Sequence, residues 1–537
     1  MSELKRKIKA RSQAKATRSQ VKATDDDDAE EADFHLDLEV FKTALSEKNL
    51  QTKQHQLDGV KWCVKNEKRG NVIGNKTIHG GIVADEMGLG KTIQMVGVII
   101  TNFVLHTLII VPKAILEQWQ REIFKLTSHN SFVYHGNNRK KYEELKTSPI
   151  VITTYGMIAN TSSELFNIKW DRVVFDEAHH LRNKNTKICI GAMKLKADIK
   201  WAVTGTPIQN KESDFYNICG ALGIEKGTFK KNKAEEWKKI YMKRTKKDVG
   251  INLEDVNYET ININWDNLSE KKLSETIHSK TQFELPKRYR TRQQEQIESA
   301  LTLVSSSSTT SHPPLPSKVS TILPLIIKAK QMCIFPALIN KTQQPQELSI
   351  IKGTTYTTKI DSLVKILLER KDNERPKLIF CHFKGEIDII KQRLEKDFEI
   401  QVIDGRTTDK HKKEILKNAA SSAAKTHGMQ TRQMLASENG KKNKILILQI
   451  QTGCEGLNLQ EYNEVYFVSP HWNPAVESQA IARCHRIGQT QSVDVFRFIM
   501  TWNDKEFKSM DEYCEQLQHA KQKVYSNFFE RETKLIR

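Results

Sequence analysis

The chain has 537 residues, and its 85 lysine and arginine residues outnumber its 65 aspartate and glutamate residues, giving a formal net charge of +20. This length suits roughly three domains, and a hydrophobic content of 38% is too high for a wholly disordered chain. The excess positive charge favours a polyanionic partner. The eight cysteines are scattered without a C-x-x-C pair, so neither a disulfide framework nor a zinc module is indicated.

No segment has the pattern of a membrane span or a secretion signal. Residues 95–111 are largely apolar, but Thr101 and Asn102 interrupt them and Pro112 follows, which favours a helix and a buried strand. The basic N-terminus lacks the apolar stretch of a signal peptide. We therefore expect an intracellular protein with no membrane contact.

Residues 1–35 form a charged segment with few apolar residues. Basic side chains dominate up to Lys22, and acidic residues follow between positions 25 and 33. Because such a segment cannot offset the entropy cost of ordering, we expect a disordered, solvated tail. Its basic half fits a nuclear-import signal or a nucleic-acid-binding arm; a merely solubilising tail fits equally well.

Two groups of short β-branched runs alternate with helical stretches, a pattern typical of parallel sheets whose strands are buried on both faces. Such alternation gives right-handed crossovers between parallel strands. The sequence therefore predicts an α/β fold with two lobes in tandem, each a parallel β-sheet flanked by helices. The runs are residues 81–84, 107–111, 150–153, 172–175 and 200–203, then 377–380, 400–403, 444–448, 464–468 and 493–499.

The predicted domain boundaries follow changes in composition. Lobe 1 is expected at residues 36–225 and lobe 2 at residues 356–505. Residues 226–355 are rich in lysine, glutamine, serine and threonine, which indicates a helical and low-complexity linker. A loop insertion is expected at residues 418–444, and a C-terminal bracing helix at residues 506–537. Neither the linker nor the insertion offers recognisable chemistry.

The first run of lobe 1 is followed by residues 85–92, DEMGLGKT. The strict phosphate-loop pattern has glycine in place of Asp85, but two glycines, Lys91 and Thr92 remain. Glycines let backbone N–H groups surround phosphate oxygens, and the following helix N-terminus adds positive potential. Lys91 is then expected on the β and γ phosphates and Thr92 on magnesium. An ordinary strand-to-helix turn is the alternative, which the preceding buried strand disfavours.

The run at residues 172–175 is followed by the acidic pair Asp176 and Glu177. Side chains at the carboxyl end of a parallel strand point into the crevice where α/β sheets bind ligands. Asp176 suits the magnesium shell, and Glu177 suits deprotonating the attacking water. Two solvated loop carboxylates are the alternative, which the phosphate loop upstream disfavours.

Over residues 51–500 the chain resembles the Swi/Snf-type ATPases of helicase superfamily two. The resemblance implies that both lobes are RecA-like, and it is most specific at residues 479–489, QAIARCHRIGQ. The other motifs that carry it are residues 55–62 (HQLDGVKW), 85–92 (DEMGLGKT), 176–179 (DEAH), 204–210 (TGTPIQN), 456–459 (GLNL) and 472–474 (WNP).

Residues 472–479 are similar to the branch of DNA-repair and transcription-termination translocases. Many members of that branch carry a RING finger, but this chain has no cysteine pattern for one, so we expect no ubiquitin-ligase activity. The chain also lacks room for an evident histone-reading module. What remains is close to a minimal motor.

The resemblance implies roles for individual residues of the nucleotide site. Gln56 would read the adenine, and Arg483 and Arg486 would be arginine fingers that reach from lobe 2 to lobe 1. Because the fingers and the phosphate loop lie on different lobes, hydrolysis would require the lobes to close. The further nucleotide contacts implied are Asp85, Glu86, Met87, Gly88, Leu89, Gly90, Lys91, Thr92 and Gln489.

Several polar residues at strand ends are candidates for gripping the DNA backbone, since hydroxyls, amides and cations at loop tips bind phosphates without reading bases. A capping or solvated role fits each of them equally well. Residues 204–206 resemble the family's motif that couples hydrolysis to strand grip, and Trp472 fits packed structure as well as function. The candidate DNA contacts are Lys113, Thr153, Thr154, Lys384, Arg406, Thr407 and Thr452.

One motif departs from the family pattern. At residues 449–455 a lysine and a Gly-Gly pair are expected, but the chain has Cys454 in place of a glycine, followed by Glu455. An anion near passing DNA phosphates would weaken binding by roughly 1 kcal/mol unless it is paired. We therefore expect less efficient coupling of hydrolysis to DNA grip at this motif.

The leading hypothesis is an ATP- and Mg²⁺-dependent motor on double-stranded DNA that remodels chromatin or displaces DNA-bound proteins in repair or transcription. Its expected partners are double-stranded DNA and nucleosomes or other DNA-bound complexes, with no zinc. Its expected location is the nucleus, or a viral or cytoplasmic DNA site. The alternatives are a strand-separating DNA or RNA helicase and a catalytically weak, DNA-bound transcription regulator.

Overall fold

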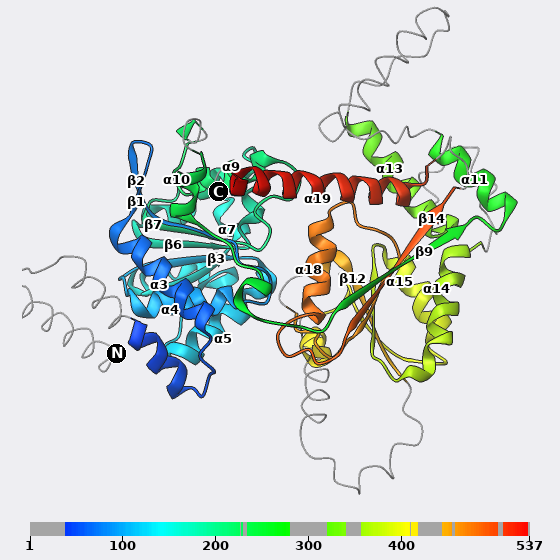
Figure 1. The fold of residues 1–537 in the computed structure, drawn as a ribbon, viewed down its shortest axis with the longest axis horizontal. Coiled ribbons are helices and arrows are strands. Elements are labelled where there is room, and N and C mark those ends of the chain that lie inside the picture. The colour runs from blue at the N-terminus through cyan, green and yellow to red at the C-terminus, as the bar shows by residue number, and fades with distance from the viewer. Residues whose placement is uncertain are drawn as a thin grey trace, which may run out of the picture.

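The computed structural model describes residues 38–225, 227–228, 233–279, 319–339, 356–408, 410–416, 443–453, 457–502 and 508–534. The predicted tail at 1–35 and almost all of the predicted insertion at 418–444 lie outside these residues. Two α/β lobes lie side by side, and one long helix runs from the second lobe to the first (Figure 1). The prediction of two tandem α/β lobes built on parallel sheets is confirmed.

Lobe 1 is built on an eight-stranded sheet in the order β1-β2-β7-β6-β3-β5-β4, with β8 pairing β2 off this path. All its strand pairs are parallel except β1 with β2. All five strands expected here are present, and the short β1, β4 and β8 are additional. The bounds are β1 (Asn71–Ile73), β2 (Lys76–Val83), β3 (Thr107–Val111), β4 (Phe132–Tyr134), β5 (Ile150–Thr154), β6 (Trp170–Asp176), β7 (Ala197–Val203) and β8 (Tyr241–Met242).

Helices cover both faces of the lobe 1 sheet because its strands are apolar on both sides. Val174 and Trp201 face a core shared with α3, α4 and α5, whereas Val173 and Phe175 face a core shared with α7, α8 and α9. An unlabelled helix at 38–47 packs on the first of these cores. The helices are α3 (Gln54–Arg69), α4 (Lys91–Thr101), α5 (Leu116–Thr127), α6 (Tyr142–Thr147), α7 (Tyr155–Ile158), α8 (Lys187–Lys194), α9 (Glu212–Ala221) and α10 (Lys233–Ile240).

Lobe 2 is built on a six-stranded, all-parallel sheet in the order β11-β12-β10-β13-β14-β9. One face packs on α11, α13, α14, α15 and α19, and the other on α17 and α18. The strands are β9 (Val256–Asn264), β10 (Lys377–Cys381), β11 (Glu399–Ile403), β12 (Lys444–Gln449), β13 (Glu464–Phe467) and β14 (Val493–Thr501). The helices are α11 (Leu268–His278), α13 (Val319–Ile334), α14 (Thr358–Glu369), α15 (Lys384–Leu394), α17 (Ile450–Gly453), α18 (Pro474–Cys484) and α19 (Met510–Lys534).

Part of the segment expected to be a linker, residues 226–355, belongs structurally to lobe 2. Strand β9 pairs with β14 along nine residues, from Val256 opposite Val493 to Asn264 opposite Thr501. Helices α11 and α13 contribute buried residues to the lobe 2 core. As an edge strand, β9 is largely exposed and alternates apolar and polar residues, so it lacks the continuous apolar run that marked the other strands. Only residues 243–255 therefore connect the last strand of lobe 1 to the first strand of lobe 2.

Helix α19, in red in Figure 1, contacts both lobes. Near its start, Asp511 accepts a hydrogen bond from Lys359 at 2.5 Å inside lobe 2. In its middle, Gln518 donates to Glu477 at 2.6 Å and Lys521 donates to the carbonyl oxygen of Trp472 at 2.8 Å. Further on, the hydroxyl of Tyr525 accepts a hydrogen bond from Lys243 of the connecting segment at 2.7 Å.

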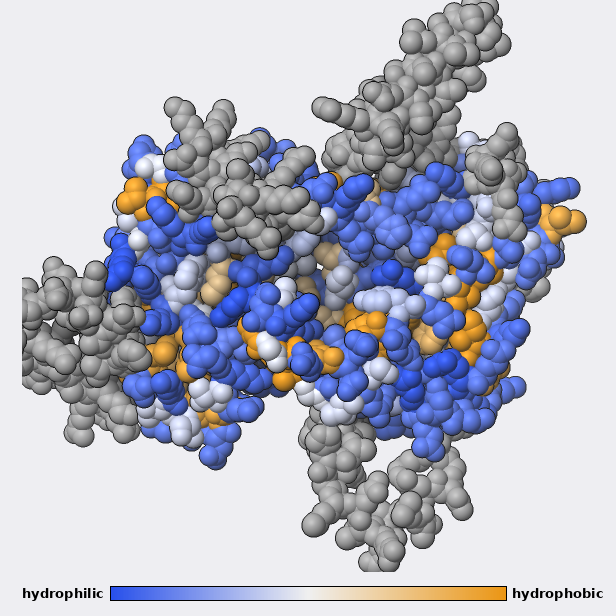
Figure 2. All heavy atoms as spheres, in the orientation of Figure 1, coloured by the Kyte–Doolittle hydropathy of each residue, from blue (hydrophilic) through white to orange (hydrophobic). Residues whose placement is uncertain are grey.

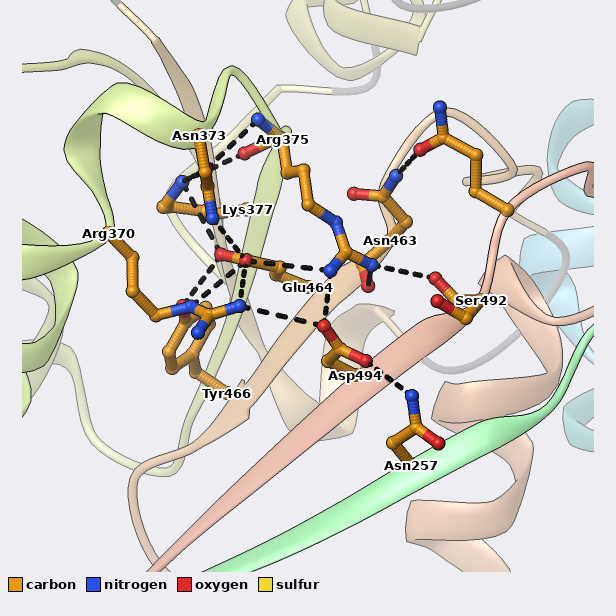
Figure 3. Close-up of polar contacts among 11 residues, drawn as sticks. Asn257, Arg370, Asn373, Arg375, Lys377, Asn463, Glu464, Tyr466, Ser492 and Asp494 are labelled. Atoms are coloured by element: carbon orange, nitrogen blue, oxygen red, sulfur yellow. Dashed lines mark hydrogen bonds and ion pairs between the residues drawn. The ribbon is translucent and has the colours of Figure 1, made fainter.

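A buried charge cluster lies where the lobe 2 strands begin (Figure 3). The carboxylate of Glu464, on β13, is fully buried and ion-pairs with Arg370 at 2.6 Å and with Lys377 at 3.4 Å. Arg375 pairs with Asp494 at the start of β14. Each carboxylate is paired with at least two cations, so this cluster ties β10, β13 and β14 together at the amino edge of the sheet.

Figure 2 shows one face of both lobes covered mainly by hydrophilic residues, with hydrophobic ones in small separate patches. Among the residues that the structure describes, no helix has the length and apolarity needed to cross a membrane.

Candidate functional site

The phosphate loop lies between β2 and α4, at the carboxyl end of the parallel strands of lobe 1. Gly88 and Gly90 have positive φ values of 95° and 81°, a region that residues with a Cβ rarely occupy. Gly90 precedes the first residue of α4, Lys91. A Cβ added at Gly90 would lie 2.3 Å from Nε2 of Gln56. The loop therefore needs glycine both for its conformation and for its close approach to α3.

Lys91 extends back along the loop. Its ammonium donates hydrogen bonds to the carbonyl oxygen of Asp85 at 2.8 Å and of Glu86 at 3.4 Å. Burial lowers its pKa, while the carboxylates of Glu177 and Asp176 raise it. The ammonium thus sits between the loop and the acidic pair, where a triphosphate would meet it. Thr92 is half-buried in the first turn of the same helix.

The acidic pair follows β6. Asp176 accepts hydrogen bonds from the indole N–H of Trp119 at 2.6 Å and from the backbone N–H of Glu177 at 2.9 Å. Glu177 has φ 50° and ψ 49°, the left-handed conformation, which costs of order 1 kcal/mol or more for a residue with a Cβ. This turn separates the two carboxylates: Asp176 lies inside the lobe, and Glu177 faces His179.

The two carboxylates have opposite pKa shifts. Burial, then the negative charge of Glu177, raises the pKa of Asp176 to about 7. Burial also acts to raise the pKa of Glu177, but His179 and the nearby cations lower it to about 2. The Nδ1 atom of His179 lies 3.3 Å from Oε2 of Glu177, yet neither atom has a hydrogen-bond partner. Glu177 is thus ionised, with accepting capacity left over.

Both predicted arginine fingers come from the end of α18 and the turn after it. A Cβ added at Gly88 would lie 3.6 Å from Cβ of Arg486, so Arg486 touches the phosphate loop across the lobe boundary. Arg483 acts electrostatically on both Lys91 and Glu177. Burial, then the charge of Arg483, lowers the pKa of Arg486. The structure therefore brings three cations and two carboxylates to one place between the lobes.

The remaining predicted nucleotide contacts divide into two groups. Gln56 is buried and donates to the carbonyl oxygen of Leu89 at 3.3 Å, within the loop. Met87 packs closely on Gly205. A Cβ added at this glycine would lie only 3.0 Å from Cγ of Met87. Gln489 stays in lobe 2, where it donates to the carbonyl oxygen of Gln460 at 2.7 Å.

Two cations that the sequence did not single out hold the phosphate loop. Arg244 pairs with Asp85, with its Nη2 2.5 Å from Oδ2 and its Nε 3.1 Å from Oδ1. Lys246 pairs with Glu86 at 3.3 Å. Both cations lie just after β8, in the lysine-rich stretch expected to be a linker, and nothing in that composition distinguishes them. Their carboxylate partners, about 160 residues upstream, become apparent only in the fold.

The motif at residues 204–210 meets lobe 2 directly. Its Gln209 accepts a hydrogen bond from Asn473 at 3.1 Å and another from Arg182 at 2.5 Å. A Cβ added at Gly205 would lie 3.5 Å from the ammonium of Lys91. This motif therefore touches both the phosphate loop and the loop that contains Trp472, whose side chain is 36% exposed.

The predicted DNA contacts of lobe 1 differ in exposure. Lys113 is exposed in the turn after β3. Thr153 is fully buried and donates to the carbonyl oxygen of Tyr134 at 2.8 Å. Thr154 is also buried, with its hydroxyl 3.3 Å from Nδ1 of His135. Only Lys113 of the three presents its side chain to solvent, and the two threonines make buried internal contacts, which differ from both the DNA-binding prediction and the capping or solvated alternative.

In lobe 2, Lys384 is exposed at the start of α15. Arg406 is bound by two carboxylates, those of Asp388 at 2.7 Å and Asp404 at 2.5 Å, and these hydrogen bonds raise its pKa. Thr407 caps the same turn, since its hydroxyl accepts from the N–H of Asp404 at 3.0 Å. A groove of about 450 Å³ runs beside these residues.

The departing motif at residues 449–455 is described only in part. Gln449 ends β12 and donates to the carbonyl oxygen of His382 at 3.3 Å. Thr452 lies in α17. Cys454 and Glu455, which carry the departure, lie outside the described residues.

Comparison with known proteins identifies the family. The SNF2-related domain matches residues 55–378, and the helicase conserved C-terminal domain matches residues 358–488. The first match alone covers more than half of the chain, so the chain belongs to the SNF2-related ATPases, with a helicase C-terminal domain as its second part. The finer placement in the repair and transcription-termination branch stays a prediction.

Individual relatives are distant. An uncharacterized ATP-dependent helicase of Mycoplasma genitalium is 27% identical over 92% of this chain and 43% of its own length. A putative ATP-dependent helicase/translocase of Bacillus subtilis is 27% identical over 80% of this chain and 45% of its own. This chain thus spans about half the length of these relatives. A probable global transactivator of Orgyia pseudotsugata multicapsid polyhedrosis virus is 25% identical over 89% of this chain and 91% of its own.

Among solved structures, the Sulfolobus solfataricus SWI2/SNF2 ATPase core in complex with double-stranded DNA is 23% identical, with a TM-score of 0.36, and covers 84% of this chain and 88% of that one.

Proposed function

We propose that this chain is an ATP-dependent translocase on double-stranded DNA that displaces bound proteins or remodels chromatin. The observation that carries the proposal is the convergence of Lys91, the acidic pair and Arg486 between the two lobes, each on the element its chemistry requires. Phosphoryl transfer depends mainly on positioning and on stabilising charge, and this arrangement supplies both.

Each side chain has a defined task in hydrolysing ATP to ADP and phosphate. Lys91 and the loop N–H groups hold the β and γ phosphates. Glu177, ionised and with one oxygen that makes no hydrogen bond of good geometry, accepts the proton of the attacking water. Arg483 and Arg486 stabilise the negative charge that develops on the transferred phosphoryl group.

The same site suits Mg²⁺. Asp176 and Thr92 offer the hard oxygen ligands that this ion prefers, and Mg²⁺ is usually bound by one or two carboxylates together with substrate phosphates. The raised pKa of Asp176 reflects burial and repulsion by Glu177. A bound cation would stabilise the ionised carboxylate and so offset both effects. Bound there, Mg²⁺ would neutralise charge on the β and γ phosphates.

The position of Arg486 on the lobe opposite the phosphate loop supports a motor rather than a static binder. Arg486 reaches the site from lobe 2, so ATP binding favours closure and release favours opening. The net charge of +20 and the exposed Lys113 and Lys384 favour a sequence-independent grip on DNA phosphates, which predicts steep salt dependence.

The decisive experiment is ATP turnover with and without duplex DNA. We expect strong stimulation by DNA in the wild type and none in Lys91→Ala, whereas Glu177→Gln binds ATP but turns it over about 10²- to 10⁴-fold more slowly. Displacement of a triplex-forming strand from duplex DNA then measures translocation. A turnover rate that ignores DNA would contradict the translocase proposal.

A second candidate is a DNA-bound transcription regulator with weak turnover. It is favoured by the viral relative named a probable global transactivator, which matches this chain over nearly the whole length of both. In that case Lys91→Ala would leave DNA binding and reporter activation intact. A partial-duplex unwinding assay tests the third possibility, strand separation.

A further inference from the structure

The connecting segment 243–255 does more than join the lobes. It leaves lobe 1 at β8 and enters lobe 2 at β9, and on the way it contacts both halves of the nucleotide site. Arg244 binds Asp85 of the phosphate loop. The carbonyl oxygen of Glu254, near its other end, lies 2.8 Å from Nε2 of His485, which precedes Arg486.

Lys246 is the residue of this segment that touches both lobes at once. Its backbone N–H donates to Oε2 of Glu86 at 2.8 Å, and its ammonium lies 3.3 Å from Oε1 of the same carboxylate. The ammonium also donates to the carbonyl oxygen of His485 at 3.2 Å. Lys246 is only 8% exposed, and a Cβ added at Gly88 would lie 3.7 Å from its Cε.

We propose that Lys246 is a positioning residue for ATP hydrolysis, which fixes the backbone before Arg486 against the phosphate loop when the lobes close. This inference rests on the proposed function and adds a component to it. Residue 485 is held at two points by one segment, its carbonyl oxygen by Lys246 and its ring by Glu254. Arg486 follows directly, so its side chain starts from a fixed place.

The charge arrangement fits this role. The ammonium is paired on one side with Glu86, which is anchored in the loop, and on the other with a neutral carbonyl, so it joins the two without adding an unpaired charge. Arg483 and Arg486 repel each other. When the backbone that carries them is already fixed, less conformational entropy is lost in holding both side chains at the site. A displacement of about 1 Å in a reacting group can cost about 100-fold in rate.

The test is ATP turnover and nucleotide binding by Lys246→Ala in the full chain, with and without duplex DNA. We expect kcat to fall about 10-fold or more, while the affinity for ATP changes much less because Lys91 and the loop are intact. Lys246→Arg, which keeps a donor, should recover part of the rate. The exposed neighbour Lys247 provides the matched control, and Lys247→Ala should match the wild type.

Two double variants separate positioning from charge neutralisation. If Lys246 only neutralises Glu86, then Glu86→Gln in the Lys246→Ala background restores turnover, and that result would overturn the inference. If Lys246 acts through Arg486, then Lys246→Ala has little further effect in the Arg486→Ala background. Additive losses would also overturn it.

The inference and the proposed function fail in different ways. Wild-type turnover that ignores DNA contradicts the translocase alone, because basal turnover still reports on Lys246. Normal kcat in Lys246→Ala, with DNA stimulation retained, contradicts the inference alone. Melting temperatures of all variants provide the folding control: a loss of kcat that tracks a lowered melting temperature, without recovery in Lys246→Arg, counts against a positioning role.

Discussion

The two edges of the molecule's parallel sheets use buried charge in opposite ways. At the amino edge of the lobe 2 sheet, the carboxylate of Glu464 accepts hydrogen bonds from Arg370, Asn373 and Tyr466, so both of its oxygens have partners. At the carboxyl edge of the lobe 1 sheet, Glu177 keeps an oxygen without a hydrogen-bond partner. Saturated charge is typical of structure, whereas charge left unsatisfied in a buried place indicates a site that a ligand completes.

The pKa shifts express the same contrast. Burial acts to raise the pKa of Glu464, but the hydrogen bonds and the nearby cations lower it by more, so the net shift is downward. In the acidic pair of lobe 1, the pKa of Asp176 is raised to about 7, whereas the pKa of Glu177 is lowered to about 2. Such separation of two neighbouring groups is typical of acid–base chemistry.

The largest expected effect comes from removing Arg486, which reaches the ligand-facing edge of lobe 1 from lobe 2. Arg486→Ala removes the cation that we propose stabilises the transferred phosphoryl group, so turnover should fall about 10³-fold or more, with ATP binding and the melting temperature largely kept. Stopped-flow binding and steady-state turnover measure the two quantities. The exposed Arg393 of lobe 2, in Arg393→Ala, is the control, and normal turnover in Arg486→Ala would remove it from the site.

Breaking the saturated edge should instead cost stability. Glu464→Gln keeps the shape of the side chain but leaves Arg370 and Lys377 without their buried partner, which costs about 3 to 5 kcal/mol of unfolding free energy. Denaturant unfolding measures it. The cluster lies at the same edge of the lobe 2 sheet as the turn after α18, but its contacts run to Asn463 and Ser492 and not to Lys91, Glu177 or Arg486, so turnover per folded molecule should change much less than stability. Lost turnover without lost stability would contradict this division.

The stability contributed by Glu464 should depend on pH in a defined direction. Its folded pKa lies below the ordinary value of 4.5, so the native state binds a proton less readily than the unfolded state. The contribution is therefore complete above pH 4.5 and is lost as the pH falls through the folded pKa. The difference in unfolding free energy between wild type and Glu464→Gln, measured from pH 7 downward, should shrink below pH 4.5. A constant difference would show that the charge of Glu464 is not its source.

Much of the ligand-facing edge could be predicted from sequence, because its signals are local. A buried strand followed by glycines and Lys91, or by Asp176 and Glu177, places chemistry at a known point of the fold. The saturated edge had no such signal, because Arg370 and Glu464 are 94 residues apart. Arg244 and Lys246 were missed for the same reason.

Local patterns also fail where burial decides the role of a side chain. Thr153 and Thr154 follow the apolar run of β5, as a DNA-facing loop tip would, yet both hydroxyls lie inside lobe 1. Strand β9 was missed in the expected linker because the expected strands were recognised as continuous apolar runs, whereas β9 alternates apolar and polar residues and is largely exposed. In each case the missing information was the position of another element.

The smallest expected effect lies between the two extremes, at Arg406. This candidate DNA contact is exposed, like a ligand-binding cation, but it is bound by Asp388 and Asp404, like a structural one. DNA phosphates must therefore displace a carboxylate to reach it. Because exposed ion pairs contribute about 0.2 to 1 kcal/mol, Asp388→Asn should tighten duplex binding by up to about 5-fold and steepen its salt dependence. Asp372→Asn removes the same charge from the opposite edge of the lobe 2 sheet and should raise affinity less. Equal gains in the two variants would mean that net charge, rather than the release of Arg406, strengthens the binding.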